Sequence, residues 1–130
     1  MPGPQTSFGN LLARLRGRRS LSLRELGTIS GVDHAYIHRL ETGEKGAPSK
    51  DIVERLIRHL KPDAREASVL RILWEVDAPS DLVELVLADP SIDLRDFQSA
   101  ALMRYRGKGR PKWPEVLRHI RTAREAIEGG

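Results

Sequence analysis

Apolar side chains recur at intervals of three and four residues along most of the chain, which is the spacing of one face of an α-helix. No stretch alternates β-branched apolar residues with polar ones, and no Asn-Gly pair marks a hairpin turn. This periodicity predicts an all-α fold. Capping residues, glycines and prolines divide it into eight helices, expected at about residues 7–18, 23–30, 34–42, 48–60, 63–76, 81–88, 94–105 and 115–127.

The 130 residues are enough for one domain or two small ones, at roughly 100–200 residues per domain. Ala78-Pro79-Ser80 is the clearest linker candidate, because it interrupts the helical pattern with a proline between two small residues. We therefore expect a flexible tail at residues 1–6, a first domain at 7–77 and a second at 78–130.

Composition excludes several classes of site. The chain contains no cysteine, so it has no disulfide, thiolate metal ligand or cysteine nucleophile. No apolar run approaches roughly 18 residues, and the N-terminus lacks the charged start and apolar core of a signal peptide. These features predict a cytoplasmic protein with no membrane partner. The net charge of +4 favours an anionic partner, and it is segregated into +4, −5 and +5 over residues 1–60, 61–98 and 99–130.

Two of the expected helices, 23–30 and 34–42, are separated by a turn at Gly31-Val32, where glycine tolerates a left-handed backbone. Val32 is expected to be buried just after the turn. Four apolar side chains can pack the two helices against each other: Leu26, Ile29, Ile37 and Leu40. The polar edge of the second helix carries His34, Ala35, His38 and Arg39. A helix held in this way can place its N-terminal end in the major groove of DNA.

Residues 8–60 resemble the Cro/C1-type (XRE) helix-turn-helix regulators. The matching positions are Arg16, Ser22, Leu26, Gly31-Val32, Asp33, Ile37, Leu40-Glu41 and Gly43, without a gap. The resemblance implies a lambda-repressor-like helix-turn-helix domain that binds double-stranded DNA. One departure is Gly27, where the family usually has alanine. Glycine costs about 1 kcal/mol of helix propensity, so the helix at 23–30 is expected to be softer.

The family's roles carry over position by position. His34, Ala35 and Arg39 are expected to face base edges, with Arg39 reading a guanine and Ala35 touching a thymine methyl. The expected phosphate contacts are Ser22, Arg24, the hydroxyl of Tyr36, Thr42, Lys45 and Lys50. Arg16 and Glu41 resemble the family's internal ion pair, since a carboxylate facing DNA would repel phosphate.

Residues 81–127 are rich in apolar side chains, yet three short helices are too few to close a large core alone. A second copy of the chain would bury the excess and set two recognition helices on one face of DNA. The operator would then be a palindrome with half-sites about one helical turn apart, or a multiple of that. Asp93 is expected to cap the helix at 94–105, with Asp96 reaching back toward the cap amide.

Three short motifs in this second part, at residues 87–91, residues 101–108 and Trp113, resemble the tail of the DdrO-type DNA-damage-response repressors. The resemblance implies a dimerising helical domain and cleavage by an IrrE/ImmA-type metalloprotease between Tyr105 and Arg106. The family has leucine where this chain has Tyr105. The basic loop 106–112 has the glycines, the proline and the charge of a segment open to proteolysis. Cutting it would release the last helix and dissolve the dimer.

The resulting interpretation is a homodimeric transcriptional repressor that is not an enzyme, takes no cofactor or metal, and is inactivated by proteolysis under stress. Alternatives stay open. The loop 106–112 can be a solvated basic segment, and the helical domain can serve protein contacts alone. An antitoxin that represses its own operon has the same two-part layout. His34 and His38 have the spacing of a zinc-binding pair, but the glutamate of a His-Glu-x-x-His site is missing.

Overall fold

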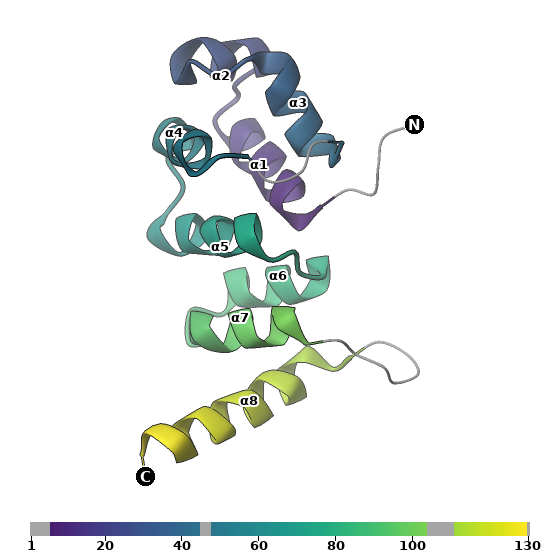
Figure 1. Ribbon diagram of the computed structural model, residues 1–130, viewed down its shortest axis with the longest axis vertical. Coiled ribbons are helices and arrows are strands. Elements are labelled where there is room, and N and C mark those ends of the chain that lie inside the picture. Colours follow the sequence, from purple (N-terminus) through teal and green to yellow (C-terminus); the bar gives the residue numbers. More distant parts are fainter. Residues whose placement is uncertain (1–5, 45–47, 104–110, 130) are drawn as a thin grey trace. The chain divides into compact units, whose positions relative to one another are not determined.

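The computed structural model of the chain describes residues 6–44, 48–103 and 111–129 (Figure 1). Every regular element in these ranges is an α-helix, and they contain no strand. The all-α fold expected from the periodicity is therefore confirmed. The chain divides into two compact units, Met1–Asp77 and Ala78–Gly130. Of the helices described, none is both long enough and apolar enough to cross a membrane.

The first unit contains α1 (Ser7–Arg18), α2 (Leu23–Ser30), α3 (His34–Thr42), α4 (Lys50–Leu60) and α5 (Ala64–Glu75). Each helix begins after a side chain that accepts a hydrogen bond from a backbone N–H of the first turn. These N-cap residues are Thr6, Ser22, Asp33, Ser49 and Asp63. The bounds predicted for α1, α2 and α3 are confirmed.

The core of this unit lies where α1 packs on α3 and α5, and where α2 packs on α3 and α4. Its fully buried side chains are apolar and include Leu12, Leu15, Leu26, Ile37, Leu40 and Leu56. The prediction that Ile29 packs between α2 and α3 is wrong, because Ile29 is 44 % exposed. The buried side of α2 is centred on Leu26 and Ser30, and residue 29 lies about 100° around the helix from residue 30.

α1 and α3 cross at Gly9, where their backbones approach more closely than a side chain would permit. A Cβ atom at Gly9 would lie 2.5 Å from the carbonyl oxygen of Leu40 and 2.7 Å from that of Glu41. Both oxygens belong to the backbone of α3, which cannot move aside without disturbing the helix. The missing side chain at Gly9 therefore sets how close α3 lies to α1.

α5 is fastened to α1 by an ion pair. The guanidinium of Arg18 donates two hydrogen bonds of 2.8 Å to the buried carboxylate of Glu66. Together with the amide of Asp63, which also donates to Glu66, this bond holds the pKa of Glu66 below its ordinary value. α5 is thus part of the same unit, although it lies beyond residues 8–60, which carry the family resemblance.

The second unit contains α6 (Ser80–Ala88), α7 (Leu94–Leu102) and α8 (Trp113–Glu128). The prediction that α7 reaches Tyr105 is wrong, because Met103 already has an extended backbone, with φ −71° and ψ 135°. α8 begins before the predicted Glu115. Pro114 lies in its first turn, where the missing N–H costs no helical hydrogen bond.

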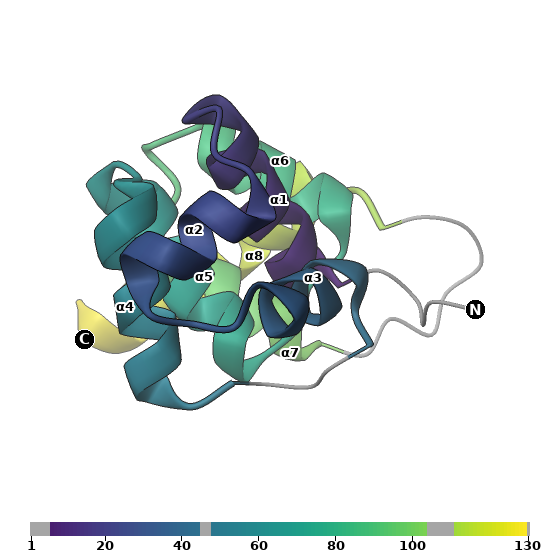
Figure 2. The ribbon, with the colours of Figure 1, turned by 90° about the horizontal axis from the view of Figure 1, so that it is seen from above.

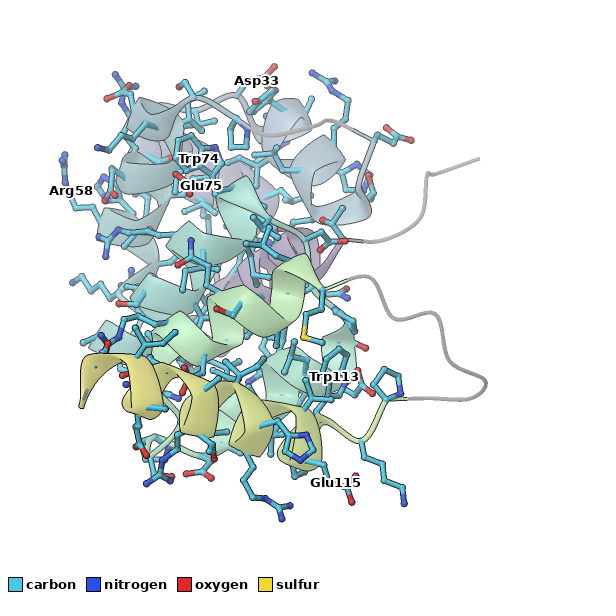
Figure 3. All side chains as sticks on the ribbon, turned by 60° about the horizontal axis from the view of Figure 1, so that its bottom comes forward. Asp33, Arg58, Trp74, Glu75, Trp113 and Glu115 are labelled. Atoms are coloured by element: carbon cyan, nitrogen blue, oxygen red, sulfur yellow. The ribbon has the colours of Figure 1, made fainter. Side chains whose placement is uncertain are left out.

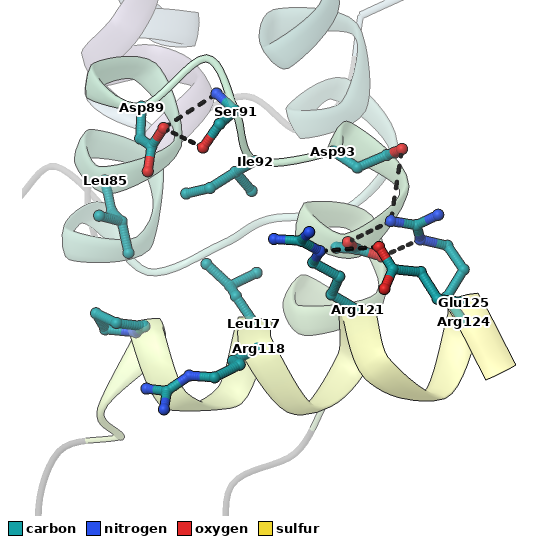
Figure 4. Close-up of a pocket in the computed structure, with 12 residues that line it drawn as sticks. Leu85, Asp89, Ser91, Ile92, Asp93, Leu117, Arg118, Arg121, Arg124 and Glu125 are labelled. Atoms are coloured by element: carbon teal, nitrogen blue, oxygen red, sulfur yellow. Dashed lines mark hydrogen bonds and ion pairs between the residues drawn. The ribbon is translucent and has the colours of Figure 1, made fainter.

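α8 is held on α7 by buried apolar side chains and by ion pairs, which include an exposed one between Arg95 and Glu128. Phe97 and Leu117 are buried, and Arg124 donates to both carboxylate oxygens of Asp96 at 2.7 and 3.1 Å (Figure 4). The bond to Asp96 raises the pKa of Arg124 above its ordinary value. Asp96 therefore pairs across to α8 instead of capping its own helix, and Asp93 supplies the cap.

Gly9→Ala is expected to lower the free energy of unfolding by about 1–3 kcal/mol, because overlap with α3 outweighs a gain of about 1 kcal/mol in helix propensity. Gly17→Ala is the matched control in the same helix. A Cβ atom at Gly17 meets nothing within 4 Å, so that variant is expected to gain up to about 1 kcal/mol. Urea unfolding followed by circular dichroism measures both, and equal gains in the two variants would contradict the close crossing.

Candidate nucleic-acid interface

α2 and α3 are joined by a tight turn. Gly31 ends α2 in the left-handed conformation, with φ 74°. Val32 follows and is 7 % exposed, and Asp33 then caps α3 by accepting a 3.0 Å hydrogen bond from the amide of Ala35. The turn brings α2 and α3 into contact, and Figure 2 shows the two helices from above.

Gly27, the departure from the family pattern, lies where α2 meets the start of α3. A Cβ atom at Gly27 would lie 2.8 Å from the carbonyl oxygen of Val32 and 3.2 Å from the Cβ atom of His34. The glycine therefore permits a close approach between the two helices, whatever it costs in helix propensity.

α3 is fixed on α1 by the ion pair that the family resemblance implied. Arg16 Nε and Nη2 donate to the two carboxylate oxygens of Glu41 at 2.7 and 2.9 Å, and Nη1 donates to the carbonyl of Leu21 at 2.9 Å. The side chain of Glu41 is 7 % exposed. Its bond to Arg16 raises the pKa of the guanidinium above the ordinary value. Glu41 is thus committed to the protein interior and is not offered to a ligand.

The residues expected to read bases lie on the side of α3 that faces away from this core. Ile37 and Leu40 are fully buried, whereas His34 is exposed. Ala35 and Arg39 are half-buried. On a helical wheel, positions 34, 35 and 39 fall within an arc of about 140° that excludes positions 37 and 40. α3 therefore presents an imidazole, a methyl group and a guanidinium on one face.

Arg24 and His34 share a shallow hollow of about 360 Å³ between α2 and α3. Thr28 also lines it, and its hydroxyl donates a 2.9 Å hydrogen bond to the carbonyl of Arg24. The sequence patterns above do not single out Thr28. Thr28 lies one turn after Arg24 on the same helix, so this spacing alone could have indicated that the two side chains are neighbours.

The other expected phosphate contacts are spread over several elements. Ser22 is exposed, but its hydroxyl accepts an amide hydrogen bond as the cap of α2. Thr42 donates to a carbonyl one turn earlier, at 3.3 Å. Lys50 is exposed and lines a separate hollow with Trp74, which is labelled in Figure 3. Arg24 thus lines the same hollow as His34 of α3, whereas Lys50 lines a different one.

Some expected site residues cannot be placed. Lys45 lies outside the described residues, as do Tyr105 and Arg106 of the expected cleavage site. Within the described ranges, no three His, Asp or Glu side chains lie close enough together to hold a metal ion.

Residues 7–70 match the helix-turn-helix domain family, a range that runs from the start of α1 into α5. These residues form a helix-turn-helix domain. Over 55 residues the chain is 42 % identical to the HTH-type transcriptional repressor RghR of Bacillus subtilis (strain 168). Over 54 residues it is 35 % identical to the uncharacterized HTH-type transcriptional regulator RghRB of the same organism.

Each of these two matches covers 42 % of this chain, and they cover 41 % of RghR and 39 % of RghRB. The chain therefore aligns with less than half the length of either relative. The similarity is to transcription regulators and not to enzymes.

Glu41→Gln is expected to lower the free energy of unfolding by about 3 kcal/mol, because it leaves the partly buried guanidinium of Arg16 without its counter-charge. Glu54→Gln is the matched control, since the Glu54–Arg71 pair is exposed and such pairs contribute about 0–1 kcal/mol. Urea unfolding of both variants measures the difference. Equally small losses would contradict an anchoring role for the Arg16–Glu41 pair.

Proposed function

We propose that the chain is a transcriptional repressor that binds a palindromic DNA operator as a homodimer. The observation that carries DNA binding is the arrangement of α3. One side of this helix is fixed by Ile37, Leu40 and the Arg16–Glu41 pair, so the other side is held rigidly outward. Repression as the mode of regulation rests on the similarity to a protein named as a transcriptional repressor.

In this proposal the exposed face of α3 enters the major groove. Arg39 donates to O6 and N7 of a guanine, Ala35 contacts a thymine methyl, and His34 reaches a neighbouring base edge. Contacts to phosphates dock the domain without selecting sequence. The residues proposed for them are Ser22, Arg24, the hydroxyl of Tyr36, Thr42, Lys45 and Lys50.

The homodimer is supported by apolar side chains that the second unit leaves uncovered. A row along α8 repeats at intervals of four, three and four residues, which is the spacing of a seam between paired helices: Val116, Ile120, Ala123 and Ile127. Val116 and Ile120 are half-buried, whereas Ala123 is exposed and Ile127 is 82 % exposed. Leu102 at the end of α7 is 63 % exposed. The spacing of the row is the same in both directions, so two antiparallel copies of α8 can place the row against itself, as a two-fold dimer requires.

The proposal includes inactivation by an IrrE/ImmA-type metalloprotease that cuts between Tyr105 and Arg106 in a stress (DNA-damage) response. It rests on the resemblance of residues 101–108 to the DdrO-type repressors and on how α8 is attached. After a cut, no covalent link would hold α8 to α7. It would be held only by noncovalent contacts, such as the 3.1 Å bond from Trp113 Nε1 to Asp81 and the Arg124–Asp96 pair.

Arg39→Ala is expected to weaken binding to a duplex selected by the wild-type protein from a random library by about 1–3 kcal/mol, and to relax the preference at one base pair. Lys50→Ala is the control, because the loss of a phosphate contact should weaken binding to selected and random duplexes alike and reduce the salt slope by about 1. Salt titrations on both duplexes measure these effects. A uniform loss on all sequences in Arg39→Ala would contradict its role in reading a base.

Ile127→Glu is expected to weaken the dimer by at least about 2 kcal/mol, because it removes a buried apolar contact from the seam and places a charge there. Thr122→Glu adds the same charge to an exposed position of α8 away from the row and should leave the dimer intact. Sedimentation velocity at micromolar concentration measures the mass. A dimer that survives Ile127→Glu would contradict the seam.

Incubation of the full chain with an IrrE/ImmA-type metalloprotease is expected to give a single cut after Tyr105 and a loss of dimer mass. Affinity for the selected duplex should fall by about 100-fold or more, since two linked contacts become single ones. Arg106→Asp should block the cut, while Arg110→Asp makes the same charge change without blocking it. Cleavage that leaves the dimer mass unchanged would contradict this switch.

A further inference from the structure

Arg39 and Tyr36 form a contact on the surface of α3 that the assigned roles do not use. They are three residues apart, so their side chains are neighbours on the helix surface. The guanidinium carbon of Arg39 lies 6.0 Å from the centre of the Tyr36 ring, over its face, which is the arrangement of a cation–π contact. Both residues are half-buried.

The nitrogens of Arg39 are not equivalent in this arrangement. Nε is buried without a hydrogen-bond partner, and it is the one side-chain nitrogen or oxygen in the described part of the chain with that property. Neither Nη nitrogen is buried in this way, and no described residue accepts a hydrogen bond from them. The guanidinium is therefore held with its inner nitrogen covered, while its two outer nitrogens are not buried in this way.

This geometry needs a restraint, because a free arginine would turn Nε toward water. Leaving a buried N–H unpaired costs more than a cation–π contact returns at a partly exposed site. The pair therefore does little for the stability of the free protein. What it supplies is a guanidinium with a restrained orientation, whose two Nη groups remain available as donors to O6 and N7 of a guanine.

We propose that Tyr36 is a positioning residue whose ring aligns the Nη groups of Arg39 and thereby sets base discrimination at one base pair of each half-site. This inference rests on the proposed function, because it deepens the role of Arg39 in reading DNA. It separates two parts of Tyr36. The ring orders Arg39, whereas the hydroxyl is free to contact a phosphate. A side chain with a ring but no hydroxyl should keep the first role and lose the second.

The test compares Tyr36→Phe, which keeps the ring, with Tyr36→Leu, which keeps apolar bulk without a ring face. The probes are the duplex selected by the wild-type protein, the same duplex changed at the base pair where Arg39→Ala loses discrimination, and a random duplex. Tyr36→Phe should keep the ratio of the first two dissociation constants within about twofold of the wild-type ratio. Tyr36→Leu should reduce this ratio about fivefold or more, while its affinity for the random duplex and its melting temperature stay close to those of Tyr36→Phe.

A Tyr36→Leu variant that retains the full ratio overturns the proposal, as does a Tyr36→Phe variant that loses as much as Tyr36→Leu. If Tyr36→Leu does not fold, the Arg39 Hε resonance of the free wild-type protein gives the second measurement. Slow exchange with water and a shift caused by the Tyr36 ring support the proposal, and a freely exchanging, unshifted Hε overturns it. Failure of the proposed function itself looks different, because the wild-type protein would then enrich no duplex from the library.

Discussion

The close crossing of α1 and α3 is the constraint on which the rest of the domain depends. Gly9 has no side chain, which lets the two backbones approach closely, and the bidentate Arg16–Glu41 ion pair fixes the rotation of one helix relative to the other. A short helix such as α3 is not stable in isolation and has many orientations open to it. Fastened at both points, it has one orientation, and its polar face is then determined by the sequence alone.

The two units differ in how completely they bury their apolar side chains. The first buries a continuous apolar core and uses charged pairs at its margin, as Arg18 and Glu66 show. The second has three helices, and it leaves Leu102 and Ile127 largely exposed. A unit this small gains stability from a partner, which in the proposed function is its own copy. The same marginal packing would make the second unit responsive to a single cut, whereas the first unit would keep its surface unchanged.

The sequence predicted the features that depend on local signals. The caps of α2 and α3 follow from Ser22 and Asp33, and the Arg16–Glu41 pair followed from a family resemblance. The sequence did not predict the close approaches at Gly9 and Gly27 or the pairing of Asp96 with Arg124. These depend on contacts between distant segments. Ile29 shows the same limit, because apolar character does not say which side of an eight-residue helix is covered.

The central claim is that the outward face of α3 is the surface that meets DNA. Backbone amide shifts of the isotope-labelled full chain, recorded while the selected duplex is added, test it most directly. The account predicts that the largest changes fall on residues 33–39 and on Arg24 at the start of α2, with small changes along α7 and α8. Changes concentrated in α7 and α8, with α3 unaffected, would contradict it.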